Sequence, residues 1–161
     1  MKVLDIMEPL GDWLTPEMTL HEAIQVMRRV KRGHGLSVNA IVVLDAERKL
    51  VGIVSTTDIL RTILPPGMFL DDDLNAFSWE GMRQDRIKKT KNIRVQDIMT
   101  EDVRVIRTDE SIMQCADRLL VEQIRRLPVI ALDGRVVGVV YLRDVYNTVT
   151  KLLCEMEPAS M

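Results

Sequence analysis

Apolar positions along the chain follow two different patterns, and each pattern predicts a different element. Residues 19–30 predict an amphipathic helix, because their apolar side chains recur at the spacing of one helix face: Leu20, Ala23, Ile24, Met27 and Val30. Residues 40–45 and 52–55 are short, almost wholly apolar runs separated by a polar turn, which predicts a β-hairpin. A second helix is expected from Asp58 to Leu64.

The same order of elements is predicted again further along the chain. The second set has three parts: a helix at 111–122, a hairpin formed by 128–133 and 138–141, and a closing helix at 144–153. A short extended stretch precedes each first helix, at 13–14 and at 103–106. Each half of the chain therefore reads β-α-β-β-α.

Both first helices open with a capping-box pattern, Thr19-x-x-Glu22 and Ser111-x-x-Gln114. Such a pattern satisfies two backbone N–H groups at the helix start, so it supports the predicted boundaries. Asp5 and Asp97 open the two copies and are expected to cap local turns.

Sequence motifs recur in the two halves, which identifies an internal repeat. VLDIM at 3–7 returns as VQDIM at 95–99, and GIVSTTDIL at 52–60 returns as GVVYLRDVY at 138–146. The pattern predicts a duplicated unit rather than one continuous fold.

The offset between the copies locates the insertions. It is 92 at the DIM motifs, 88 at Asp45 and Asp133, and 86 at Asp58 and Asp144. This alignment places four extra residues of the first copy around RGHGLSVN and two more in its hairpin turn, DAERK against DG. Both positions are expected to be loops, where insertions are tolerated.

The repeat divides the chain into four segments: a first motif at 1–64, an inserted linker at 65–93, a second motif at 94–153 and a C-terminal tail at 154–161. PPG at 65–67 should end the preceding helix. Asp71–Asp73 could cap a helix that continues to about Ile87, with an unstructured linker as the alternative.

Composition narrows the class of protein. Of the 161 residues, 47% are apolar and only 4% aromatic, so a globular core must be aliphatic, with ten methionines on its apolar faces. The formal net charge of −2 gives no sign of a surface for nucleic acid. The run Val136–Leu142 is far shorter than the roughly 20 residues that span a bilayer. Without an apolar leader region after Lys2, we expect a cytoplasmic protein that binds neither membrane nor nucleic acid.

The doubled β-α-β-β-α unit, the DIM opening and the G-h-h-[ST]-x-x-D close resemble the CBS domain family, named after cystathionine β-synthase. The resemblance covers 1–64 and 94–153. It implies a CBS pair, or Bateman module: an α+β fold with two three-stranded sheets packed with helices about a pseudo-twofold axis, commonly a homodimer. Since the chain contains no further domain, we expect a stand-alone module that acts in trans on an unknown protein partner.

The family's usual role is regulatory sensing, including energy sensing, by binding adenosine-containing ligands in clefts between the motifs. The resemblance implies AMP, ADP or ATP as ligand here, with S-adenosylmethionine less favoured and no cofactor required. Asp58 matches the family position that accepts hydrogen bonds from the ribose hydroxyls, which suits a carboxylate. The full candidate adenosine and ribose set is Gly11, Asp12, Trp13, Ser55, Thr57 and Asp58.

Phosphate contacts are expected from two sources. The helix that starts near Asp58 should offer free backbone N–H groups. Cations should come from the opposite motif, at Arg125 and Arg126 of IRRLPV and at Arg143, because arginine makes charge-assisted contacts to phosphate. The alternative interpretation is that Asp58 and the hydroxyls before it only cap the helix.

The second cleft departs from the family pattern. Tyr141 stands at the Ser/Thr position, although Asp144 is retained, and LSVN replaces IRRL. Only three residues of the inserted loop could then supply a cation: Lys31, Arg32 or His34. A weak or empty second site is expected at Thr100, Val103, Tyr141 and Asp144.

An enzymatic role finds no support in the motifs. There is no G-x-x-x-x-G-K-[ST] phosphate loop and no G-x-G-x-x-G. Two isolated histidines, His21 and His34, and two distant cysteines suggest neither a metal site nor a catalytic set. Cys115 should be a small buried hydrophobe. The competing hypothesis is a ligand-free dimerisation and scaffold module that binds a partner through 65–93.

Overall fold

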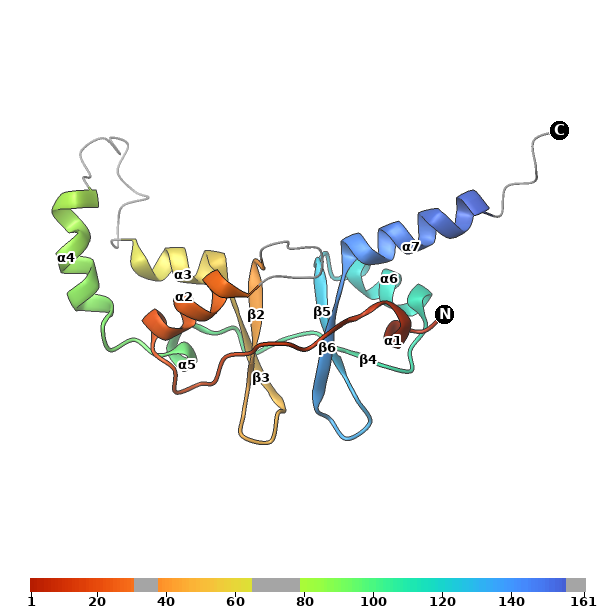
Figure 1. Ribbon diagram of the computed structural model, residues 1–161, viewed down its shortest axis with the longest axis horizontal. Helices are drawn as coiled ribbons and strands as arrows, with labels where there is room; N and C mark the ends of the chain where they lie inside the picture. Colours follow the sequence, from red (N-terminus) through yellow and green to blue (C-terminus); the bar gives the residue numbers. More distant parts are fainter. Residues whose placement is uncertain (31–37, 65–78, 156–161) are drawn as a thin grey trace. The chain divides into compact units, whose positions relative to one another are not determined.

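The computed structural model describes residues 1–30, 38–64 and 79–155 of the chain (Figure 1). Backbone contacts group the chain into two compact units. Unit 1 comprises Met1–Gly11, Glu47–Lys49 and Arg104–Met161, and unit 2 comprises Asp12–Ala46 and Leu50–Val103.

Unit 2 consists of a hairpin and the helices packed on it: α2 (Leu20–Arg29), β2 (Ala40–Leu44), β3 (Leu50–Ser55), α3 (Thr56–Ile63), α4 (Trp79–Thr90) and α5 (Val95–Ile98). β2 and β3 are antiparallel, as the two apolar runs predicted. Leu14 makes a parallel bridge to Val43 on one side of the hairpin, and Thr100 makes an antiparallel bridge to Ile53 on the other.

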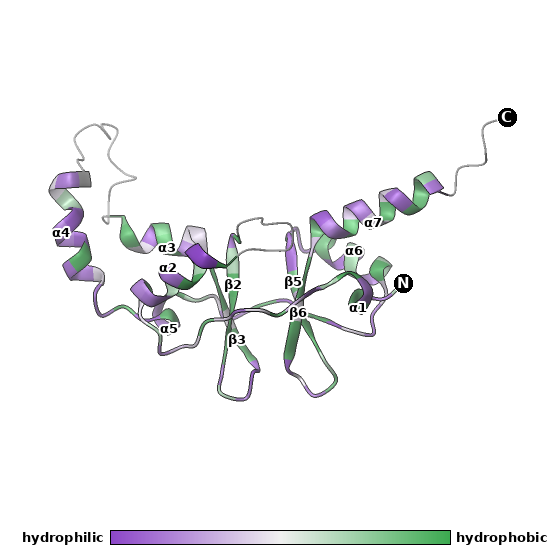
Figure 2. Cartoon of the chain, viewed as in Figure 1, coloured by the Kyte–Doolittle hydropathy of each residue, from purple (hydrophilic) through white to green (hydrophobic). Residues whose placement is uncertain are grey.

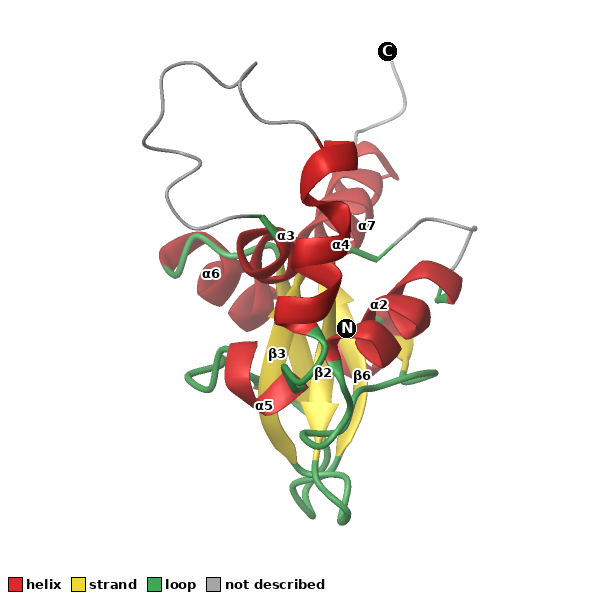
Figure 3. Cartoon of the chain, turned by 90° about the vertical axis from the view of Figure 1, so that its left-hand side faces the viewer, coloured by secondary structure: helices red, strands yellow, loops and turns green. Residues whose placement is uncertain are grey.

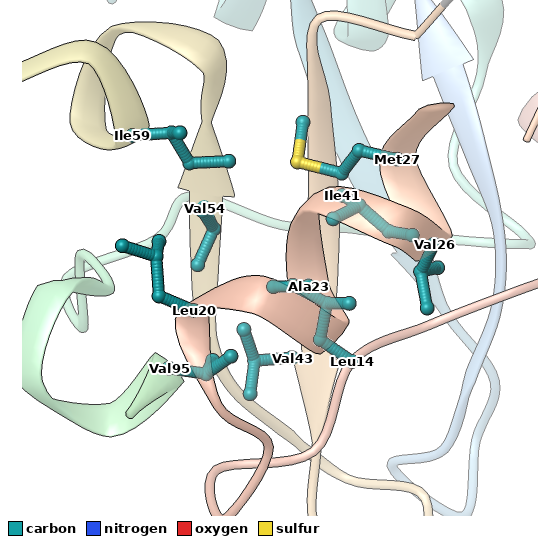
Figure 4. Packing of buried hydrophobic residues seen from close by; sticks show 10 residues of the cluster. All are labelled: Leu14, Leu20, Ala23, Val26, Met27, Ile41, Val43, Val54, Ile59 and Val95. Carbon is teal, nitrogen blue, oxygen red and sulfur yellow. The ribbon is translucent and has the colours of Figure 1, made fainter. Parts of the chain in front are cut away.

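The core of unit 2 is aliphatic, as composition predicted. Figure 4 shows side chains from α2, the hairpin and α5 that point toward one another. Of the predicted α2 stripe, Leu20, Ala23 and Met27 are buried, and Val26 joins them. The helix therefore covers the hairpin with the face that its periodicity indicated.

Unit 1 repeats this design with a larger sheet. Its elements are α1 (Val3–Ile6), β1 (Glu8–Pro9), β4 (Ile106–Arg107), α6 (Ile112–Val121), β5 (Arg126–Ile130), β6 (Val136–Tyr141) and α7 (Leu142–Glu155). The strand order is β1-β6-β5-β4. Strands β4, β5 and β6 are the three that the family resemblance implied, and β1 is a fourth strand supplied by the start of the chain. The α+β class is confirmed, but the two sheets have four and two strands and not three each as expected.

The opening segments of the two sequence copies are exchanged between the units. β1 of the first copy pairs with β6 of the second, and Val3 of α1 is fully buried in the core of unit 1. Conversely, Val95 of α5, from the second copy, is fully buried in the core of unit 2. Each compact unit is therefore completed by a segment from the other copy (Figure 1).

The methionine of each DIM motif packs on a strand glycine. A Cβ on Gly52 would lie 2.7 Å from Met99 Sδ, and one on Gly138 would lie 2.9 Å from Met7 Sδ and 2.5 Å from the Glu8 carbonyl oxygen. Only glycine leaves room for these approaches. The two motifs that define the repeat are thus contact partners.

The predicted insertion of two residues in the first hairpin turn is wrong. Leu44 pairs with Leu50, and Ile130 pairs with Val136, so both turns have the same length. Arg48 and Gly134 occupy the same left-handed position, with φ of 66° and 86°. The offset is therefore already 86 along β2 and β5, and all extra residues of the first copy lie between α2 and β2. The strand pairing gives the correct alignment, whereas matching Asp45 with Asp133 gave an offset that is two residues too large.

Helix α4 partly matches the helix predicted in the linker. It runs from Trp79 to Thr90, beyond the predicted end near Ile87, while the predicted cap at Asp71–Asp73 lies outside the described residues. Its sequence is polar on nearly every side (Figure 2). At the other end of the chain, α7 continues to Glu155 and includes the first residues of the predicted tail. No helix in the described ranges is long and apolar enough to cross a membrane.

Candidate functional site

The strand-to-helix junction at Ser55 is closed by a capping box. β3 ends at Ser55 and α3 begins at Thr56, two residues earlier than predicted. The Asp58 N–H donates to Ser55 Oγ at 3.1 Å, and the Ser55 N–H donates to Asp58 Oδ2 at 2.9 Å. Ser55 is therefore the N-cap, and Asp58 is the third helical residue. These two side chains therefore do cap α3, as the alternative interpretation expected.

The start of α3 offers fewer N–H groups than expected. Thr56 donates its N–H to the Asn39 carbonyl at 2.9 Å, and the Asp58 N–H is taken by Ser55. Within the described residues, Thr57 is the one first-turn residue here whose N–H lacks an acceptor. The predicted set of free N–H groups is thereby reduced to one. The role of Asn39 could not be predicted from the sequence, because its backbone carbonyl makes the contact and every residue type has one.

Asp58 keeps acceptor capacity beyond its cap bond. The side chain is half-buried, and only Oδ2 accepts a hydrogen bond from the described part of the chain. Oδ1 is left to accept from a hydroxyl group, and Oδ2 has a second lone pair. Thr56 and Thr57 are exposed beside it. The junction can therefore cap α3 and bind a polyhydroxylated ligand at the same time.

Asp12 and Trp13 approach the same end of the hairpin as Ser55. Leu14 N–H donates to the Val42 carbonyl at 2.9 Å in a parallel bridge. Because the bridge is parallel, the residues before Leu14 run toward the start of β2, where Ala40 pairs with Ser55. Trp13 is half-buried, whereas Asp12 is exposed and lies 4.0 Å from the Arg29 guanidinium. Such exposed pairs contribute little stability.

Gly11 belongs to unit 1 and not to the unit that contains Asp58. It is exposed, and a Cβ built on it would meet no atom of the described residues within 4 Å. No local packing therefore requires glycine at this position.

Three arginines gather where β5, β6 and α7 meet in unit 1. Arg126 opens β5 opposite Tyr141, the last residue of β6. The Arg125 carbonyl accepts the N–H of Leu142, the first residue of α7, at 2.8 Å, and Arg143 follows directly. Arg125 and Arg143 are exposed, and neither side chain pairs with another described residue. This basic cluster, Arg125, Arg126 and Arg143, can receive an anion.

At the equivalent described positions, the first copy has no arginines. The bond from Thr56 to Asn39 is equivalent to the bond from Leu142 to Arg125, so Asn39 and Ala40 take the places of Arg125 and Arg126. The structural counterpart of IRRL is thus Val38–Ile41 and not LSVN. The three alternative cations, Lys31, Arg32 and His34, lie outside the described residues.

The residues predicted for a second site are divided between the units. Tyr141 and Asp144 lie half-buried in unit 1, whereas Thr100 and Val103 lie in unit 2. The Thr100 N–H and carbonyl are both bonded to Ile53, at 2.9 Å each, so its backbone serves the sheet. Tyr141 takes the position of Ser55, directly before a helix, and places an aromatic ring where the first copy has a hydroxymethyl group.

Other reactive groups are buried or isolated. Burial raises the pKa of the Cys115 thiol to about 11, so almost no thiolate forms near neutral pH. His21 is exposed on α2, within 3.3 Å of Gln25. Among the described residues, no group of three or more potential ligands is arranged to hold a metal ion.

Comparison with known sequences identifies the repeat. The sequence model of the CBS domain matches residues 3–65 and 95–151. The CBS domain-containing protein CBSX2, chloroplastic, of Arabidopsis thaliana is 29% identical over 164 residues, which cover 92% of this chain and 66% of that protein. The chain therefore spans slightly less than two thirds of that relative.

Solved structures agree with this assignment. The crystal structure of CBSX2 in complex with AMP matches with a TM-score of 0.67 and 25% identity, covering 94% of this chain and 98% of that chain. The cytosolic domain of the Mg²⁺ channel MgtE in complex with ATP has a TM-score of 0.66 at 23% identity, covering 91% and 48%. The CBS domain pair of protein MJ0100, in complex with 5′-methylthioadenosine and S-adenosyl-L-methionine, has a TM-score of 0.61 at 21% identity, covering 94% and 98%. The last two similarities are below 25% identity and therefore show only that the fold is shared.

Proposed function

Because this chain belongs to the CBS domain family, we propose that it is a regulatory module that binds an adenosine nucleotide of the AMP, ADP or ATP class. The observation that carries the proposal is the Asp58 carboxylate. It is half-buried at the start of α3, with Oδ1 unengaged by the described residues. The complex of CBSX2 with AMP supports the choice of ligand.

In this proposal each candidate residue has a separate role. Asp58 accepts hydrogen bonds from the ribose hydroxyls, Ser55 and Thr57 line the sugar and the α-phosphate, and the Thr57 N–H donates to phosphate. Adenine lies against the segment of Gly11, Asp12 and Trp13. The basic cluster of Arg125, Arg126 and Arg143 supplies the charge that balances the phosphates.

The second cleft is proposed to be weak or empty. Tyr141 fills the place of the serine, and Asn39 and Ala40 replace the arginines of the first site. Without a cation from the described residues, phosphate binding beside Asp144 has little electrostatic support.

The output of the module is proposed to be regulatory and not catalytic. A homodimer that signals ligand occupancy to a separate protein in trans fits the family, with the cytoplasm as its compartment. S-adenosylmethionine is the less favoured ligand, because the basic cluster suits phosphate better than a sulfonium group.

One observation favours a second function, a ligand-free scaffold. Ser55 and Asp58 bond to each other, so a structural role alone could account for both side chains. In that case, 65–93 would be the segment that binds a partner.

The proposal is tested by calorimetric titration of protein stripped of bound ligand with AMP, ADP, ATP, adenosine and S-adenosylmethionine. Asp58→Ala should weaken nucleotide binding about tenfold to a hundredfold, since hydrogen bonds to a charged group contribute about 1.5–3 kcal/mol. Arg126→Ala should weaken AMP and ATP more than adenosine.

The matched control is Gln114→Ala, because Gln114 holds the same capping position in α6 that Asp58 holds in α3. It should lower stability and leave affinity unchanged. If no nucleotide binds the wild type, or if Gln114→Ala and Asp58→Ala weaken binding equally, the scaffold function is favoured.

A further inference from the structure

Arg86 is the one charged side chain that is buried in the described parts of the chain, with 8% of its surface exposed. It lies on α4 and projects to the end of α3. Its Nε donates to the Ile63 carbonyl at 2.7 Å, and one terminal NH2 group donates to the Thr62 carbonyl at 2.9 Å. No described carboxylate forms an ion pair with it.

The acceptors of Arg86 are the carbonyl groups that the end of a helix leaves unpaired. α3 ends at Ile63, so the last carbonyls have no further helical N–H to accept from. A planar guanidinium can donate to two of them at once. Its positive charge also complements the negative end of the helix dipole. The bond is therefore a C-terminal cap supplied by a residue 23 positions away from Ile63.

Few other described side chains of α4 are buried. Apart from Arg86, the described side chains of α4 are exposed, except for the half-buried Met82 and Thr90. Even Ile87 has 57% of its surface exposed. Figure 2 shows α4 as a largely hydrophilic helix, and backbone contacts place it next to α3 (Figure 3). The described side chains of α4 offer little apolar surface for burial, so we expect its docking to depend on Arg86.

α3 connects this contact with the proposed ligand site. Ser55 and Asp58 stand at its N-terminal end, and the acceptors of Arg86 stand at its C-terminal end. Eight helical residues separate the two ends by about 12 Å. A short helix moves as a rigid rod, so a ligand that shifts its first turn also shifts the carbonyls that Arg86 binds.

We propose that Arg86 fastens α4 to α3, and that the docking of α4 reports whether the ligand site at the other end of α3 is occupied. The second half of this inference rests on the proposed function, whereas the first half does not. By linkage, a ligand that strengthens docking must bind more weakly when docking is lost, and by the same factor.

The test is hydrogen exchange of the full chain, with and without ATP, in wild type and in Arg86→Met. Without ligand, Arg86→Met should speed exchange of the α4 amides about tenfold or more, because two charge-assisted hydrogen bonds are lost. Arg83→Met is the matched control, since Arg83 is exposed on the same helix, and it should leave exchange unchanged. Arg86→Lys keeps the charge but not the planar guanidinium that donates to both carbonyls, so exchange of the α4 amides should be intermediate in this variant.

With saturating ATP, exchange of α4 should change in wild type and not in Arg86→Met, while calorimetry still detects binding to the variant. Equal α4 exchange in wild type and Arg86→Met without ligand would overturn the docking role. Nucleotide binding that leaves α4 exchange unchanged in wild type would overturn the reporting role. Absence of any binding would instead defeat the proposed function, and the experiment without ligand would still decide the docking role.

Discussion

Gly52 and Gly138 show how single positions connect the two repeated motifs. Each glycine accepts the methionine of a DIM motif at a distance that a β-carbon would prevent. The recurrence of both glycines and both methionines was visible in the sequence, but their contact was not. The repeat therefore preserves a packing pair whose members are far apart along the chain.

The two glycines should differ in their tolerance of alanine. At Gly138 the obstacle includes the rigid Glu8 carbonyl oxygen, 2.5 Å from the new Cβ. At Gly52 the closest atom is the flexible Met99 Sδ at 2.7 Å, and the Thr100 carbonyl oxygen is further away, at 3.0 Å. Gly138→Ala should lower the free energy of unfolding by about 1–3 kcal/mol, and Gly52→Ala by less. Urea denaturation measures both, with Gly11→Ala as a control that should have no effect. A greater loss in Gly52→Ala would contradict the steric explanation.

At the scale of elements, capping-box patterns located the starts of α2 and α6, whereas α3 and α7 begin two residues before the predicted positions. The Ser111–Gln114 capping box is formed with both bonds, at 3.1 and 2.8 Å. Thr19 caps α2 through the Glu22 N–H, but its hydroxyl donates to the Glu22 carboxylate. At Ser55, capping was the alternative interpretation, and the structure shows that it takes the reciprocal form of a capping box with Asp58 at the third helical position.

The cap of α6 can be tested by a pair of substitutions. Ser111→Ala removes the oxygen that accepts the Gln114 N–H and should cost about 1 kcal/mol of stability. Ser111→Asp retains a capping oxygen and should cost much less. Thermal or urea unfolding of the two variants provides the comparison. Equal losses would mean that the contribution of Ser111 is not its cap bond.

Helix α4 marks the limit of element prediction. Its sequence has no apolar stripe, and its attachment depends on Arg86 reaching the carbonyls of another helix. Neither the period nor the residue type identifies such a contact. The predicted helix in the linker was therefore right in kind, but its means of attachment was not foreseen.

At the scale of the whole molecule, the sequence copies and the compact units do not coincide. Residues 1–11 belong with the second copy, and α5 belongs with the first. Val3 and Val95 occupy equivalent places in the two cores, each completely buried. The stability of each unit thus depends on a segment from the other copy.

This exchange predicts effects at a distance along the sequence. Val3→Ala should lower the stability of unit 1 by about 1–3 kcal/mol and speed hydrogen exchange in β5 and β6. Val95→Ala should instead affect β2 and β3. Peptide-resolved hydrogen exchange of the two full-length variants measures this, each variant serving as the other's control. Faster exchange of β2 and β3 in Val3→Ala alone would contradict the assignment.

The sequence by itself determined the repeat, the α+β class, the hairpins and the amphipathic face of α2. The helices and hairpins depend on spacing and residue type within about 15 residues, where geometry follows directly from the period. The repeat was identified from matching motifs at offsets of 86 to 92 residues. The resemblance to the CBS family, and not local spacing, singled out Asp58 and the arginines as candidate ligand contacts.

Only the tertiary structure decided which copy each DIM segment completes, which N–H groups remain at the start of α3, and what caps its end. Asn39, Gly138 and Arg86 owe their roles to partners that lie many residues away. Contacts of this kind depend on how elements pack, and the local spacing of apolar residues does not specify that packing.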